Sequence, residues 1–225
     1  MSPRPALPPP PPPVEIRSWP DREAMLADRA LVLGELVTRY IGRRRLGVLW
    51  TWGAVAALGW ALVGLAILAL EEPHDVFAGI LAVPFALFGA ALLIPAVVLA
   101  GTGLGRDREV RALLDAWGAL DRDPDRDASL RRPGDSLLWL LASGLLCAVG
   151  LFVCVVLPAT AERGVDTYGS VAGSMGLGMV AWLTGLAGVV RAFAHRRWVL
   201  RVLGGAAAGP APASPPAPAR PDAHG

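Results

Sequence analysis

Four long apolar stretches, separated by polar and charged segments, dominate the hydrophobic pattern of the chain. They cover about residues 46–70, 76–100, 137–157 and 169–190. Each is close to the ~20 residues that an α-helix needs to cross ~30 Å of hydrocarbon, and none has an ionisable side chain in its interior. The pattern therefore predicts an all-α polytopic membrane protein with four transmembrane helices. Pro84 and Pro95 fall within the second stretch and are expected to bend that helix.

Two further segments have the spacing of amphipathic cytosolic helices. In residues 18–45, after a helix-start signal at Asp21, the apolar positions of one face are Leu26, Leu33, Val37 and Tyr40. In the polar segment 101–136 a helix is predicted over 108–121, with an apolar face made of Val110, Leu113, Leu114, Trp117 and Leu120. Acidic residues surround this second face, which suits a negative membrane surface poorly. We expect the face to dock on protein, most simply on the 18–45 helix.

The remaining segments connect or extend these helices. Residues 1–17 form a proline-rich arm, whose Pro8–Pro13 tract predicts polyproline II. Residues 191–225 are first basic and then rich in Ala and Pro, and we expect both ends to be disordered. The four spans form two hairpins, 46–100 and 137–190. Because the first apolar run begins only after three consecutive arginines, at 43–45, we expect no signal peptide.

Composition supports the membrane setting, and charge orients the chain in it. Of the 225 residues, 54% are hydrophobic and 18% are charged, whereas soluble domains average about 45–50% and about 25%. All 21 basic residues are arginines, and twenty of them lie in residues 1–45, 101–136 and 191–225, on one side of the predicted membrane. The positive-inside rule therefore predicts that both termini are cytoplasmic. We expect the partners to be membrane lipid and a protein or a second copy, and not nucleic acid.

Side chains next to the spans are predicted to lie at the membrane interface. Interface anchors are aromatic and flank the apolar core, and the candidates beside arginines are Trp50, Trp52, Trp139 and Trp198. His195 follows the fourth span together with Arg196 and Arg197. We expect this basic group to contact lipid headgroups.

The turn between the first two spans comes closest to a metal site. Its possible ligands, carboxylates and an imidazole within five positions, are Glu71, Glu72, His74 and Asp75. Asp75 also suits the N-cap of the second span, and Pro73 suits a tight turn between helices. We favour this capped turn, and we expect no metal or other cofactor.

Small residues recur at helical spacing along the fourth span. Such residues let neighbouring helices approach closely, and the predicted packing positions are Ala172, Ser174, Gly176, Gly178, Ala181 and Gly185. Ser174 could instead be the nucleophile of a membrane-embedded hydrolase, with His74 as its base. Ala172, however, stands where a nucleophile motif of the Gly-x-Ser type requires glycine. Helix packing is the simpler interpretation.

The spans also limit the kinds of transport that the protein could perform. Ion-coupled transport usually places ionisable side chains within the membrane, facing the pathway. The predicted spans offer only Ser, Thr, Cys and Trp as polar groups. A coupled transporter is therefore disfavoured, whereas a passive pore built from several copies stays open.

Three stretches carry a resemblance to a known group of proteins. They are LVTRYIGRRRLGVLWTWG at 36–53, ALEEPHD at 69–75 and GRDREVRALLDAW at 105–117. The chain resembles uncharacterised multi-pass membrane proteins from actinobacteria over about residues 18–203. That resemblance implies a bacterial plasma-membrane setting and brings no assigned activity or site residues.

These observations lead to one principal hypothesis and two alternatives. The principal hypothesis is a non-enzymatic accessory or scaffold protein that binds a partner through its cytosolic helices. The first alternative is a passive channel or exporter subunit that oligomerises along the Gly-rich fourth helix. The second alternative is the membrane-embedded serine hydrolase.

Overall fold

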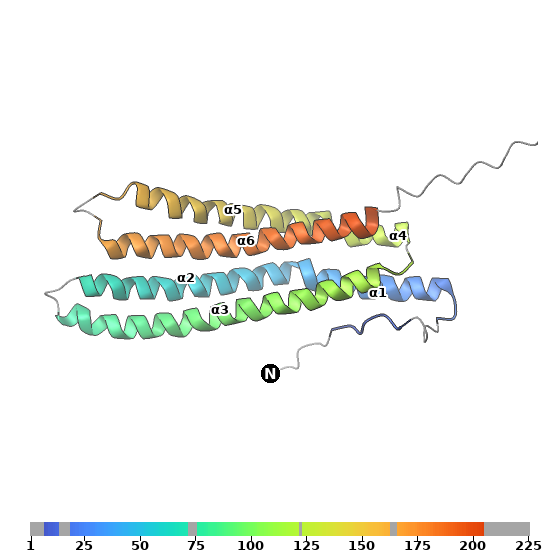
Figure 1. Cartoon of the computed structure of the whole chain (residues 1–225), viewed down its shortest axis with the longest axis horizontal. Coiled ribbons are helices and arrows are strands. Elements are labelled where there is room, and N and C mark those ends of the chain that lie inside the picture. The colour runs from blue at the N-terminus through green and yellow to red at the C-terminus, as the bar shows by residue number, and fades with distance from the viewer. Residues whose placement is uncertain (1–6, 14–18, 72–75, 122, 163–165, 205–225) are drawn as a thin grey trace, which may run out of the picture.

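The computed structural model describes residues 7–13, 19–71, 76–121, 123–162 and 166–204, and it is helical with no β-strand in these ranges (Figure 1). The elements are α1 (Arg22–Ile41), α2 (Arg43–Glu71), α3 (Val76–Gly118), α4 (Pro124–Asp127), the 3₁₀ helix η2 (Ala128–Arg131), α5 (Pro133–Ala159) and α6 (Tyr168–Gly204). The predicted all-α fold is confirmed. The predicted positions Glu72, His74 and Asp75, and most of both chain ends, lie outside the described residues.

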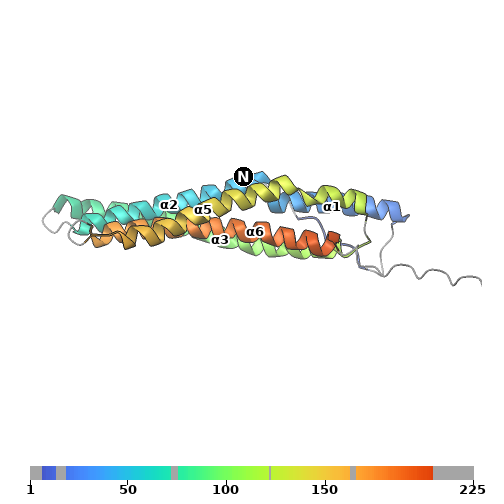
Figure 2. The same cartoon turned by 90° about the horizontal axis from the view of Figure 1, so that it is seen from above.

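Helices α2, α3, α5 and α6 are long and apolar enough to cross a membrane, and each contains one predicted span. They lie side by side in the order α5, α6, α2, α3 (Figure 1), because α5 packs on α6, α6 on α2 and α2 on α3. Seen from above, the long helices lie along one axis and cross one another, so that α5 runs from the side of α2 near α1 to the side of α6 at the other end (Figure 2). The long apolar side chains, such as Phe88 and Leu145, point outward and are largely exposed, as expected for helices solvated by lipid.

Glycines allow the closest approaches between the long helices. A Cβ on Gly150 of α5 would lie 2.6 Å from the carbonyl oxygen of Gly178 of α6 and 2.3 Å from the backbone nitrogen of Trp182. A Cβ on Gly59 of α2 would lie 2.9 Å from the carbonyl oxygen of Gly89 of α3. Backbone thus meets backbone in both hairpins, the arrangement by which small residues drive helix association in lipid.

Helix α3 does not end where the second span does. The sequence predicted a separate helix over 108–121, but α3 runs without a break from Val76 to Gly118. Gly101, Gly103 and Gly105, in the segment between the span and the predicted helix, are helical. A glycine costs about 1 kcal/mol relative to alanine inside a helix. Continuing the helix avoids a second set of unpaired backbone groups, and its last turns are held by packing on α1.

Helix α1 continues the line of α2 beyond the spans and defines what we call the α1 end of the molecule (Figure 1). It begins at Asp21, whose carboxylate accepts a hydrogen bond of 2.7 Å from the backbone N–H of Ala24. It ends before Gly42, where a Cβ would lie 2.3 Å from the carbonyl oxygen of Thr38. The single predicted helix of residues 18–45 is therefore interrupted at Gly42, and α2 starts at Arg43.

The main buried core lies at the α1 end. It is built from α1, the last turns of α3, η2, the beginning of α5 and the last turns of α6. Its fully buried members include Leu33, Leu36 and Val37 from α1 and Leu114 from α3. The molecule thus combines a row of apolar helices with a buried hydrophobic core at one end, of the kind found in water-soluble domains.

Candidate functional site at the α1 end

The apolar face predicted on residues 108–121 packs inside this core. Four of its members are buried and the fifth, Leu113, packs partly buried against the same cluster; the buried ones are Val110, Leu114, Trp117 and Leu120. The contacts come from the chain's own α1, which was the simplest expectation. A separate protein could reach these side chains only by displacing α1, so this face is not an open docking surface.

A buried ion pair fastens α1 to the segment after α3. The guanidinium of Arg29 donates to the carboxylate of Asp127, with 2.6 Å between Nη1 and Oδ1. The two side chains are only 1% and 6% exposed. Arg29 Nε also donates to the carbonyl oxygen of Trp117. This pair fixes α1, α3 and the α4–η2 segment in one arrangement.

Two exposed ion pairs join the same segments at the surface. Arg22 of α1 lies 2.5 Å from Asp121, and Arg126 of α4 pairs with Glu23. The hydrogen bond and the charge of Asp121 raise the pKa of Arg22 above its ordinary value. Because these pairs are solvated, they orient the segments more than they stabilise them.

The described part of the proline-rich arm docks on the α1 end. The indole N–H of Trp117 donates a hydrogen bond of 3.1 Å to the carbonyl oxygen of Pro9. Leu7 packs against the core, and Pro8, Pro11 and Pro12 are half-buried, whereas Pro9 and Pro10 are exposed. Extended proline-rich segments are commonly bound on aromatic side chains in this way.

Arginines surround Tyr40 where α1, α3 and α6 meet. Arg111 Nε donates a hydrogen bond of 2.8 Å to the Tyr40 hydroxyl, and its guanidinium lies 5.5 Å from the ring centroid. The guanidinium of Arg191 lies 5.4 Å from the Tyr40 ring and 5.4 Å from the Trp139 ring. Both distances are typical of cation–π contacts. The aromatic rings thus hold cations at the boundary of the apolar spans.

Asp107 supplies the negative charge of this cluster. Its side chain is buried, forms an ion pair with Arg191, and lies 3.9 Å from Arg45. One carboxylate thereby faces two arginines from different helices, α6 and α2. A buried charge in this position is stabilised only while its partners stay in place, so Asp107 couples the two hairpins at the α1 end.

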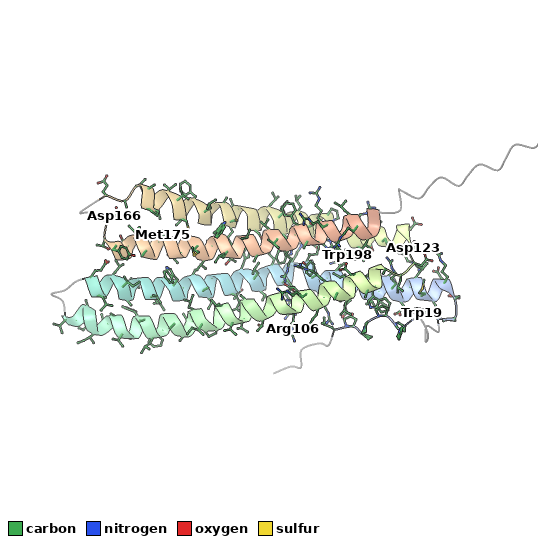
Figure 3. All side chains as sticks on the ribbon, in the orientation of Figure 1. Trp19, Arg106, Asp123, Asp166, Met175 and Trp198 are labelled. Carbon is green, nitrogen blue, oxygen red and sulfur yellow. The ribbon has the colours of Figure 1, made fainter. Side chains whose placement is uncertain are left out.

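The structure corrects the predicted interface role of three residues. Trp139, Trp198 and His195 were expected at the lipid headgroups, but all three are buried in the core at the α1 end. The indole N–H of Trp139 donates a hydrogen bond of 2.7 Å to the carbonyl oxygen of Ile41. Figure 3 shows Trp198 on the side of α6 that faces the other hairpin. The physical reason is that α1 and the end of α3 supply a protein surface for these rings.

His195 is a buried side chain of this cluster whose hydrogen-bonding groups lack partners in the described part of the chain. It is 1% exposed and stacks on Trp198, with 5.9 Å between the ring centroids. Neither ring nitrogen forms a hydrogen bond of ordinary geometry within the described residues, although the backbone of Arg131 lies near the ring and interacts with it. The indole nitrogen of Trp198 is likewise buried and unbonded. Buried polar groups are rarely left unpaired in proteins, so these atoms mark a place where a ligand could bind.

Two cavities adjoin His195. The larger, of about 500 Å³, lies between α1, α3 and α6 and is lined by Tyr40, Arg111 and Arg201 among others. The smaller, of about 260 Å³, lies between α5 and α6 beside Leu140 and Val199. The larger cavity falls in the size range of small-molecule sites, about 300–1,000 Å³. It combines apolar walls with several cationic side chains.

At the opposite end, Glu71 has a structural contact. Its Oε1 accepts a hydrogen bond of 2.6 Å from the backbone N–H of Gly169, at the start of α6. A carboxylate at a helix N-terminus is favoured by the helix dipole, and here it ties the two hairpins together. Within the described residues, no group of three possible metal ligands is gathered in one place.

The small residues of α6 are used for packing within the chain. A Cβ on Gly176 would collide with the Trp60 ring, one on Gly178 would lie 2.8 Å from the sulfur of Cys154, and one on Gly185 would meet the Cys147 backbone. Ser174 is half-buried and donates a hydrogen bond of 2.9 Å to the carbonyl oxygen of Val171, one turn earlier in the helix. Ala172 and Ala181 are half-buried on the same helix. Ser174 therefore makes the contact that is ordinary for a hydroxyl within a helix, and His74 lies outside the described residues.

Comparison with known protein families, curated proteins and solved structures finds no match for this chain. The resemblance to actinobacterial membrane proteins therefore rests on the sequence stretches alone. Four apolar helices of membrane-spanning length place the chain in the class of polytopic helical membrane proteins.

Proposed function

We propose that the chain is a non-enzymatic accessory or scaffold protein of the bacterial plasma membrane. Both chain ends lie in the cytoplasm, and the α1 end binds another protein there. The orientation is supported by the arginines, of which twenty of the 21 lie in residues 1–45, 101–136 and 191–225 and only one lies between the spans elsewhere.

The observation that carries the proposal is the packed platform formed by α1. This helix lies outside the spans, and a buried ion pair and an apolar core hold it in one position beyond them. Pre-organised surfaces lose less entropy on binding than mobile ones. A rigid projection of this kind suits recognition of a partner.

Leu31 is the side chain that best probes this platform. It is 71% exposed in the middle of α1. It precedes the first span by about 20 Å of helix, from the rise of 1.5 Å per residue, so the hydrocarbon does not cover it. An exposed leucine alone needs no explanation, but its place makes it a direct reporter of whatever contacts the outer face of α1.

A photo-crosslinking amino acid at Leu31 in the full chain, expressed in bacteria, tests the proposal. We expect an adduct with one defined polypeptide, identified by mass spectrometry. The matched control is the same amino acid at Leu145, which is similarly exposed but lies within a predicted span. The control should yield lipid adducts. Lipid adducts from Leu145 together with no protein adduct from Leu31 would overturn the accessory role.

The alternatives have weaker support. A channel that oligomerises along α6 would need a free small-residue face, and that face contacts α2 and α5 of the same chain. The hydrolase would need a base near Ser174, and His74 lies outside the described residues. Neither alternative has an observation that favours it over the accessory role.

A further inference from the structure

The larger cavity beside His195 changes in polarity along the helix that lines it. From the membrane side outward, α6 contributes Val189, Val190 and Phe193, and then Arg197 and Arg201. These residues share one stripe of the helix, about 18 Å long from the rise of 1.5 Å per residue. The cavity is therefore apolar at the end nearer the spans and cationic at the end nearer the last turn of α6.

The cationic end is not neutralised by the chain. Arg111 of α3 faces it beside Arg197 and Arg201, and no ion pair to any of these three guanidiniums occurs within the described ranges. Asp115 is the acidic residue of the lining. Three positive charges against one negative charge leave a net attraction for an anion.

The cavity also has unused hydrogen-bonding groups. His195 lines it, and neither ring nitrogen makes a hydrogen bond of ordinary geometry within the described residues, although the side chain is 1% exposed. Trp198, which also lines it, has a buried indole nitrogen without an acceptor. A ligand with oxygen acceptors would remove the cost of these unpaired donors.

We propose that this cavity binds the phosphate headgroup of an anionic phospholipid in the leaflet on the side of the α1 end. The phosphate lies among Arg111, Arg197 and Arg201, within reach of the donors on His195 and Trp198. The acyl chains follow Val190 and Phe193 into the hydrocarbon.

A lipid fits better than a soluble phosphate compound because of the apolar end. Val190 and Phe193 are 52% and 47% exposed, and they continue the lipid-facing surface of α6. A soluble anion would leave these side chains uncovered, whereas acyl chains would cover them. Basic pockets between helices at the membrane surface are typical sites for anionic lipid headgroups.

Purified full-length protein in neutral detergent allows a direct test. Short-chain phosphatidylglycerol, short-chain phosphatidylcholine and glycerol 3-phosphate are titrated separately, and binding is followed by native mass spectrometry. We expect phosphatidylglycerol to bind at least tenfold more tightly than either of the others. Equal binding of phosphatidylcholine would show that the cavity binds acyl chains without selecting an anionic headgroup. Equal binding of glycerol 3-phosphate would show that the cavity recognises a soluble phosphate compound. Both results would overturn the proposal.

Two variants with the same loss of charge locate the site. Arg197→Gln with Arg201→Gln removes two of the three arginines around the proposed phosphate position, whereas Arg106→Gln with Arg108→Gln removes two exposed arginines of α3 that do not line the cavity. We expect the dissociation constant for phosphatidylglycerol to rise at least tenfold in the first variant and less than twofold in the second. Similar changes in both would indicate general surface charge and contradict the site.

His195→Phe separates binding from packing. Phenylalanine keeps an aromatic ring against Trp198 but removes the ring nitrogens. We expect several-fold weaker phosphatidylglycerol binding with an unchanged or higher melting temperature, because two unpaired buried nitrogens are lost. Unchanged affinity in this variant would show that His195 takes no part in the site and would overturn its assigned role.

Discussion

Arg29 and Asp127 form a buried ion pair between two segments that are ninety-eight positions apart in sequence. Arg29 lies on the apolar face of α1, between Leu26 and Leu33 at helical spacing. An arginine at such a position must find an acid, because an unpaired buried charge is very costly. Asp127, at the junction of α4 and η2, is that acid, and it fixes where the chain returns after α3.

Breaking this pair should destabilise the α1 end strongly. Asp127→Asn leaves the Arg29 charge buried, and we expect a loss of about 3–5 kcal/mol in the free energy of unfolding. Thermal unfolding in detergent, followed by circular dichroism, measures the change. Glu35→Ala removes an exposed i,i+4 partner of Arg39 and should cost less than about 1 kcal/mol. Replacing both buried partners, as in Arg29→Met with Asp127→Leu, should cost less than Asp127→Asn alone. A mild effect of Asp127→Asn would contradict the pair's role.

The second hairpin depends on backbone contact at Gly150. Gly150→Ala places a methyl group against the backbone of α6, and overpacking of this kind costs about 1–3 kcal/mol. Gly144→Ala, on the same helix, meets nothing within 4 Å. It should be neutral or stabilising by up to about 1 kcal/mol from helix propensity. Melting temperatures of the two variants in one detergent give the comparison, and equal values would show that α5 and α6 do not pack as described.

The proline-rich arm should loosen when its hydrogen bond to Trp117 is removed. Trp117→Phe keeps a buried aromatic ring but removes the donor to Pro9; a hydrogen bond contributes about 0.5–1.5 kcal/mol net. We expect a spin label at Pro10→Cys to become more mobile, in a chain whose two native cysteines are replaced by alanine. Trp52→Phe, in α2, is the control and should leave the label unchanged. Equal mobility in both variants would mean that the arm is held by other contacts.

The orientation in the membrane can be tested with single cysteines. Tyr168, at the start of α6, and Ser129, in η2, are both exposed but lie at opposite ends of the molecule. In intact spheroplasts, with the native cysteines replaced by alanine, a membrane-impermeant maleimide should label Tyr168→Cys. Ser129→Cys should react only after lysis, because the arginine-rich side faces the cytoplasm. The reverse labelling pattern would invert the proposed topology.

The local pattern of apolar residues was enough to predict helices whose formation depends on their own sequence and on the solvent around them, lipid or water. The four spans follow from apolar length, and the face on 108–121 follows from a period near 3.6. The pattern was insufficient where a helix continues past its apolar part. A separate helix was expected over 108–121, yet α3 passes through Gly101, Gly103 and Gly105 without a break because its last turns pack on α1.

The candidate site was the hardest part to predict, because its members come from different helices. Tyr40, Asp107, Arg191 and His195 lie in three segments of the sequence, and each alone resembles an ordinary residue at the end of a span. One signal was available: Asp107 is an acid immediately after a span, among arginines. Its burial against Arg191 and Arg45 could be known only once the two hairpins were placed side by side.

The sequence by itself determined that this chain has four membrane-length helices and two amphipathic faces, because apolar length and helical period act locally along the chain. Only the tertiary structure decided that those faces bury each other, that Trp139, Trp198 and His195 lie in a protein core, and that three arginines surround a cavity. Those outcomes depend on which helices become neighbours. That choice is made by contacts between residues far apart in the chain, such as Arg29 with Asp127 and Gly150 with Gly178.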